Sequence, residues 1–135
     1  MSTADQPVEA RPLRDVVSDI GLYPIEAFEF VQQGLAVSVR EIHGKRPDPE
    51  QIRHIRGQQL CDGLRRFAIK RWGMLARTVL SLWHINSTLD FGRIVFAMVD
   101  AGLMSTSEDD SLEDFRNVFD FKAAFEQDYQ IACSA

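Results

Sequence analysis

The side chains best suited to chemistry in this 135-residue chain are three histidines and two cysteines. We expect His43 and His84 near helix ends, where the helix dipole alone favours an imidazolium, and His54 in a basic segment. No His-x-x-Glu-His or Cys-x-x-Cys spacing gathers these residues into a metal site. Cys61 falls beside Leu64 on the inner side of a predicted helix, which favours a core thiol over a nucleophile. The sequence therefore predicts no catalytic residue, metal or cofactor.

Positive charge is concentrated between Arg53 and Arg77, where seven Lys or Arg residues accompany one acid and give +6 within a chain of net charge −5. Arg66, Lys70 and Arg77 fall on one helical line if the helix runs through Gly73, and a phosphate backbone or an acidic protein face can dock along such a line. The predicted partner-binding residues are Arg65, Arg66, Lys70 and Arg77. Long basic side chains more often line a solvated face. A solvated face, a protein-binding face and a nucleic-acid-binding face all stay open.

Negative charge is concentrated between Asp100 and Asp128, where nine acids outnumber two bases and give −7. The residues predicted to form an acidic face are Glu108, Asp109, Asp110, Glu113 and Asp114. Two blocks of opposite charge steer partners in some proteins and pair with each other in others. The sequence leaves both alternatives open.

Helices must position these residues, because apolar side chains recur at spacings of three and four along most of the chain. We predict five or six helices in a mainly α fold. They run from Pro12 to Gly21, from Pro24 to Gly44, from Gln58 to Trp72, after Gly73 as far as Trp83, from Ser87 to Gly102, and for a short stretch after Asp120. Ser87 and Asp90 form a capping-box pattern, and Gly102 followed by Leu103 is typical of a left-handed helix end.

Between Leu103 and Phe121 the apolar residues partly alternate, which predicts one β-hairpin near the C-terminus with Glu108–Asp114 at its tip. A further short strand or extended segment is expected from Ile52 to Ile55. The predicted core contains Phe28, Leu35, Val39, Leu64, Phe67, Leu75, Val79, Phe91, Val95 and Met98. Three helices followed by a hairpin loosely resemble a winged-helix domain. Its recognition helix would offer only Arg93 to a DNA groove, and its wing would be acidic, which argues against DNA reading.

With 45% apolar and 26% charged residues, the chain has the composition of one globular domain. We expect residues 1–11 to be disordered, residues 12–130 to form a single helical domain, and residues 131–135 to be a tail. The longest apolar run, Ile94 to Val99, is too short to cross a bilayer, so we expect no membrane association. Two cysteines and a polar N-terminus favour a cytoplasmic location.

Four segments carry a resemblance to one protein family: YPIEAFEFVQQGL, HIRGQQLCDGLRRFAIKRWGMLARTVLSLW, DFGRIVFAMVDAGLM and DFRNVFDFKAAF. They resemble a family of short conserved hypothetical proteins from planctomycetes and verrucomicrobia. Arg56 departs from the small hydroxyl residue expected before Gly57. The resemblance implies bacterial origin and a common fold, and it implies no activity.

Two functions follow as hypotheses. The first is a cytoplasmic protein-interaction or adaptor module without catalytic activity, which binds a protein partner or self-associates. The alternative is an RNA- or DNA-associated factor that binds phosphates through Arg53–Arg77.

Overall fold

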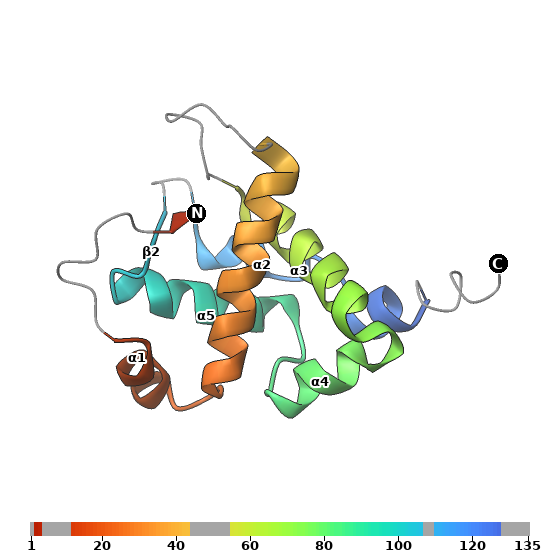
Figure 1. Ribbon diagram of the computed structural model, residues 1–135, viewed down its shortest axis with the longest axis horizontal. Helices are drawn as coiled ribbons and strands as arrows, with labels where there is room; N and C mark the ends of the chain where they lie inside the picture. Colours follow the sequence, from red (N-terminus) through yellow and green to blue (C-terminus); the bar gives the residue numbers. More distant parts are fainter. Residues whose placement is uncertain (1, 4–11, 44–54, 107–109, 128–135) are drawn as a thin grey trace.

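The computed structural model describes residues 2–3, 12–43, 55–106 and 110–127. Five α-helices dominate this part of the chain (Figure 1): α1 (Leu13–Ile20), α2 (Ile25–His43), α3 (Gly57–Trp72), α4 (Ala76–Leu82) and α5 (Thr88–Asp100). The shorter elements are β1 (Ser2–Thr3), the 3-10 turns η1 (Gly73–Leu75) and η2 (Leu112–Phe115), β2 (Met104–Ser105), and the π-helical turn η3 (Ala123–Gln127). The predicted mainly α fold is confirmed.

Both ends of α5 follow from local sequence. At its start, the Asp90 carboxylate accepts hydrogen bonds from the backbone amides of Asn86 and Ser87, at 2.9 and 3.1 Å. At its end, Gly102 has a φ of 80°, and the amide of Leu103 donates to the carbonyl of Met98 at 2.8 Å. This left-handed turn suits glycine because other residues pay a steric penalty there. Both predicted boundaries are confirmed.

Helices α2 and α3 pack closely because glycines lie at their crossing. A methyl group on Gly34 of α2 would overlap the Leu64 side chain, and one on Gly63 of α3 would overlap the Ser38 hydroxyl. The Ser38 hydroxyl is fully buried and has no hydrogen-bond partner among the described residues. The crossing therefore requires small residues and tolerates one unsatisfied polar group.

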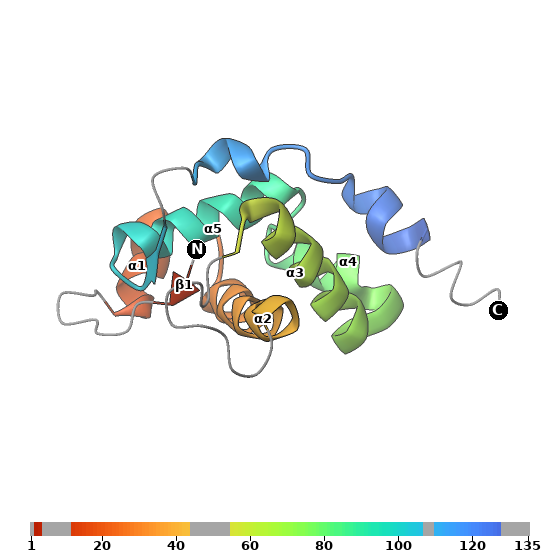
Figure 2. The ribbon, with the colours of Figure 1, turned by 90° about the horizontal axis from the view of Figure 1, so that it is seen from above.

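The core lies where α2, α3 and α5 meet. Six predicted core residues are buried: Phe28, Leu35, Leu64, Phe91, Val95 and Met98. Val39 and Phe67 are partly buried and pack against the core, and Val79 is partly buried. Figure 2 shows α5 lying between α2 and the segment that contains η2. Such burial supplies the main stabilising free energy of a domain this size.

The assignment of Leu75 to the core is wrong, and Leu82, which lies seven residues further along the same helical stripe, is exposed as well. Leu75 is 58% exposed and Leu82 is 72% exposed. The predicted helix end at Gly73, which has a φ of 57°, is confirmed. The chain then passes through the 3-10 turn η1 before α4, so the apolar spacing alone does not fix which side of this segment is buried. Only Ala76 and Leu80 of α4 are buried.

The predicted C-terminal hairpin is also wrong. Strand β2 pairs antiparallel with β1, with Ser105 opposite Ser2 and Met104 opposite Thr3. The described residues 110–121 contain no strand, and Leu112–Phe115 forms η2 instead. Because a wing requires that hairpin, and because α5 is covered by α1, α2 and η2, the winged-helix likeness is not confirmed.

Several expectations fall outside the described residues. These are the expected extended segment at residues 52–54 and the expected tail at residues 131–135. Most of the N-terminal segment also lies outside, although Ser2–Thr3 is described and forms β1.

Candidate functional site

Two of the predicted partner-binding residues form ion pairs on α3. Arg65 lies 3.2 Å from the Asp62 carboxylate. Arg66 lies 3.1 Å from Asp62 and 3.0 Å from Glu41 of α2, so it links the two helices. Exposed pairs of this kind contribute about 0 to 1 kcal/mol each. Arg65 and Arg66 already pair with carboxylates of the same chain, which favours a structural role for both residues.

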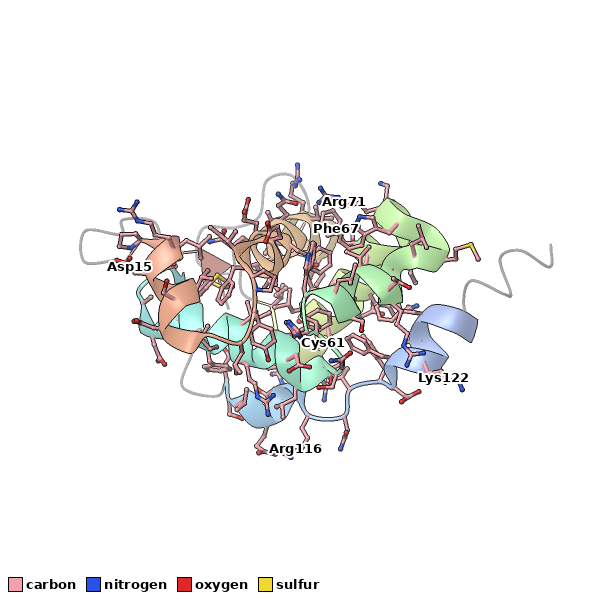
Figure 3. All side chains as sticks on the ribbon, turned by 90° about the horizontal axis from the view of Figure 1, so that it is seen from below. Asp15, Cys61, Phe67, Arg71, Arg116 and Lys122 are labelled. Carbon is pink, nitrogen blue, oxygen red and sulfur yellow. The ribbon has the colours of Figure 1, made fainter. Side chains whose placement is uncertain are left out.

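The third predicted residue, Lys70, is exposed near the end of α3. Its neighbour Arg71 lies over two rings, with its guanidinium carbon 5.4 Å from the Trp72 ring centre and 6.0 Å from that of Phe67. Arg71 also donates a hydrogen bond of 2.8 Å to Gln33 of α2. Figure 3 shows Arg71 beside Phe67, at the opposite edge of the view from Arg116.

The fourth predicted residue, Arg77, lies at an apolar surface that we call the α3–α4 corner: Met74, Leu75 and Leu82, with Arg77 at the rim. Met74 is 66% exposed, and the two leucines are exposed to a similar degree. Met74, Arg77 and Leu82 line a hollow of about 370 Å³ together with Phe125 of η3. Full burial of one large aliphatic side chain is worth about 1.5 to 3 kcal/mol, so this corner offers binding energy that the fold leaves unused.

Three of the five residues predicted to form an acidic face are described, and they lie in or next to η2. Glu113 pairs with Arg116 at 2.9 Å, and the Asp114 carboxylate accepts a 3.0 Å hydrogen bond from the amide of Ser111. Asp110 is described and also engaged, whereas Glu108 and Asp109 lie outside the described residues. The Cβ of Asp114 lies against Gly57, the first residue of α3.

The positions of Asp114 and Lys70 exclude an ion pair between them within one chain. Lys70 follows Gly57 by 13 residues, which is roughly 20 Å along a helix. A carboxylate at the start of α3 instead interacts favourably with the positive end of the helix dipole.

A buried polar cluster joins the start of α2 to α5. The Tyr23 hydroxyl donates a 2.5 Å hydrogen bond to Asp90, and Arg93 lies 3.1 Å from the same carboxylate. Burial, reinforced by the hydrogen bond to Asp90, raises the pKa of Tyr23 to about 12. The pKa of Arg93 is raised, first by its hydrogen bond to Tyr23 and then by the negative charges of Tyr23 and Asp90. Arg93 is therefore held by its own chain and is not a free base-reading side chain.

Among the residues that the structure describes, those considered for nucleophilic or metal chemistry do not form a site, and His54 and Cys133 lie outside that part of the chain. Cys61 is a buried free thiol whose pKa is raised to about 12 by burial and by the nearby Asp62 charge. Thiolate is the reactive form, so this cysteine is inert at neutral pH. His84 is exposed with a φ of 65°, and His43 ends α2. Residues 2–3, 12–43, 55–106 and 110–127 contain no group of three potential metal ligands.

Sequence reasoning missed the apolar part of the α3–α4 corner because it assigned Leu75 to the core. The break at Gly73 was predicted, but the 3-10 turn η1 that follows it was not. It also missed a hollow lined by Glu26, Glu29, Trp72 and Trp83, which draws on α2, the end of α3, and α4 with the turn after it.

Comparison with family models, curated proteins and solved structures finds no match to this chain. The resemblance to the planctomycete and verrucomicrobial family therefore stays a prediction. Within the part of the chain that the structure describes, no helix combines the length and apolar character needed to cross a membrane.

Proposed function

We propose that this protein is a cytoplasmic protein-interaction module that binds its partner at the α3–α4 corner. The observation that carries the proposal is the exposure of three large apolar side chains within nine residues: Met74, Leu75 and Leu82. Exposed leucines are common singly, but exposed apolar side chains grouped beside a hollow, which Met74 and Leu82 line, are typical of a binding surface. The partner-binding role predicted for Arg77 forms part of this proposal.

The partner we propose is an amphipathic segment of another protein that carries Asp or Glu beside its apolar face. Its apolar side chains would cover Met74 and Leu82, and its carboxylates would lie near Arg77 and Lys70. Aliphatic contacts provide most of the affinity, because rim charges mainly affect the association rate and partner choice. A short segment held by three apolar anchors is expected to bind weakly, at micromolar strength, after the loss of its conformational entropy.

Nucleic-acid binding is the weaker alternative. Arg65 and Arg66 already pair with Asp62 and Glu41, so a phosphate would have to compete with carboxylates of the same chain. The cluster beside Arg77 is aliphatic, whereas single-stranded nucleic acids stack on aromatic rings. The alternative predicts RNA binding that weakens steeply with salt.

The test is selection from a displayed library of random peptides against the purified full chain. We expect enriched peptides to place apolar residues three or four apart with Asp or Glu between them. The double variant Met74→Ser/Leu82→Ser should lose these peptides at least tenfold and keep its melting temperature, because both side chains are already exposed. Leu22→Ser is the matched control, since Leu22 is 54% exposed on another surface.

Each other result counts against the proposal. Equal enrichment on wild type and the double variant would place binding elsewhere. Concentration-dependent mass in light scattering that the double variant abolishes would make a second copy of this chain the partner. Binding of single-stranded RNA at low salt, lost in Lys70→Glu/Arg77→Glu but kept in the apolar double variant, would support the nucleic-acid alternative.

A further inference from the structure

A second hollow, separate from the α3–α4 corner, lies between the first half of α2 and the ends of α3 and α4. It encloses about 260 Å³ and is lined by Glu26, Glu29, Phe30, Gln33, Arg71, Trp72, Val79 and Trp83. Three aromatic rings, two carboxylates and one guanidinium therefore border one small space. Both tryptophans of the chain are among them.

The aromatic rings form a connected wall. Trp72 and Trp83 meet edge to face, with ring centres 5.4 Å apart and planes at 80°. Phe30 lies behind them, 5.3 Å from Trp72 and 5.9 Å from Trp83. Phe30 is buried, whereas both indoles are partly exposed. Two indoles at right angles make a corner of fixed shape, because their packing against Phe30 restricts both rotamers.

The charges around this wall favour a cation. Glu26 and Glu29 are both exposed and lie three residues apart, on neighbouring positions of one face of α2. Arg71 is the one guanidinium that lines the hollow, so the ionised lining groups have a net charge of −1. Arg71 lies over the Trp72 ring, which is the position that a weakly hydrated cation favours beside an indole.

We propose that this hollow binds a quaternary ammonium group, as found in choline or in trimethylated lysine. The methyl groups would contact the Trp83 and Trp72 rings, and the charge would lie near Glu26 and Glu29. A methylated ammonium fits better than a plain one, since it loses less hydration on entering an aromatic corner. This proposal is independent of the protein-binding function at the α3–α4 corner.

The experiment is titration of the full chain with choline, followed by tryptophan fluorescence. Both indoles line the hollow, so binding should change the emission directly. The neutral control is 3,3-dimethylbutan-1-ol, which has the shape of choline without its charge. We expect saturable quenching by choline and none by the alcohol at the same concentrations. A trimethyl-lysine peptide and its unmethylated counterpart then distinguish a protein source from a small-molecule source.

Two conservative variants should shift the affinity in opposite directions. Glu26→Gln/Glu29→Gln removes the attracting charges and should weaken choline binding about threefold or more. Arg71→Gln removes the competing cation and should tighten it about two- to fivefold. Both changes are at exposed positions, so the melting temperature serves as a folding control. Equal quenching by choline and the alcohol, or an unchanged affinity in both variants, would overturn the proposal.

Discussion

The hydrogen bond between Tyr23 and Asp90 gives a quantitative prediction about stability at high pH. The pKa of Tyr23 rises from 10.0 to about 12 in the folded protein, mainly because its hydroxyl is buried. The folded state therefore keeps a proton that the unfolded state loses above pH 10. The contribution of Tyr23 to the free energy of unfolding is fully present below pH 10. It falls as the pH rises toward 12, in total by about 2.7 kcal/mol for two pKa units.

The measurement is urea unfolding of wild type and Tyr23→Phe between pH 8.5 and 11.5. Subtracting the two stabilities removes the titration of lysines and of Cys61, which both proteins share. Below pH 9.5, we expect wild type to be more stable by about 1.5 to 3 kcal/mol, the usual value of a hydrogen bond to a charged group. This advantage should shrink by about 2 kcal/mol by pH 11.5. A difference that stays constant across the range would refute the assignment of a buried, neutral Tyr23 hydroxyl bonded to Asp90.

Three further changes test the packing of the fold. Ser38→Ala removes a buried hydroxyl without a described partner and should raise the free energy of unfolding by about 1 kcal/mol or more; a loss of stability in urea unfolding would mean that the hydroxyl is satisfied. Thr88→Val removes the hydroxyl that donates to the Phe115 carbonyl at 2.6 Å and should lower that free energy by about 1 to 3 kcal/mol; an unchanged urea midpoint would contradict this. In a Cys133→Ser background, Cys61 should resist a disulfide reagent at pH 8 until urea unfolds the chain; rapid native labelling would contradict its burial.

Helix ends were the part of the fold that the sequence predicted best, because each depends on a few neighbouring residues. Gly21 ends α1 with a φ of 64°, and Asp90 caps α5 from three residues inside it. Asp120 likewise caps the turn that starts the last helical segment, through a 3.0 Å hydrogen bond from the amide of Ala123.

Contacts between segments that are distant in the sequence could not be predicted from the local spacing of residues. The alternating apolar residues after Leu112 resemble a strand, yet Phe115, Phe121 and Phe125 are separate anchors that insert into the helical core from turns. Thr88, whose hydroxyl also accepts from the amide of Val118 at 3.2 Å, holds this segment against α5. Sixty-seven residues separate Tyr23 from Asp90, so no spacing rule indicates their hydrogen bond.

The candidate site was predictable in its charge and not in its apolar part. Arg77 was identified because bases cluster in the sequence, and the structure brings it to the α3–α4 corner. Leu75 and Leu82 fit an apolar helical stripe in the segment that follows the predicted break at Gly73. That segment buries only Ala76 and Leu80, and which of its sides meets the core depends on three-dimensional packing.

The most direct test of binding at the α3–α4 corner is amide chemical-shift mapping of the isotopically labelled chain with a selected acidic amphipathic peptide. The proposal predicts that the largest shifts fall on η1 and α4, between Gly73 and Leu82, and that Met74→Ser/Leu82→Ser abolishes them. Shifts that concentrate around Leu22, in the turn after α1, or that persist in the double variant, would contradict it.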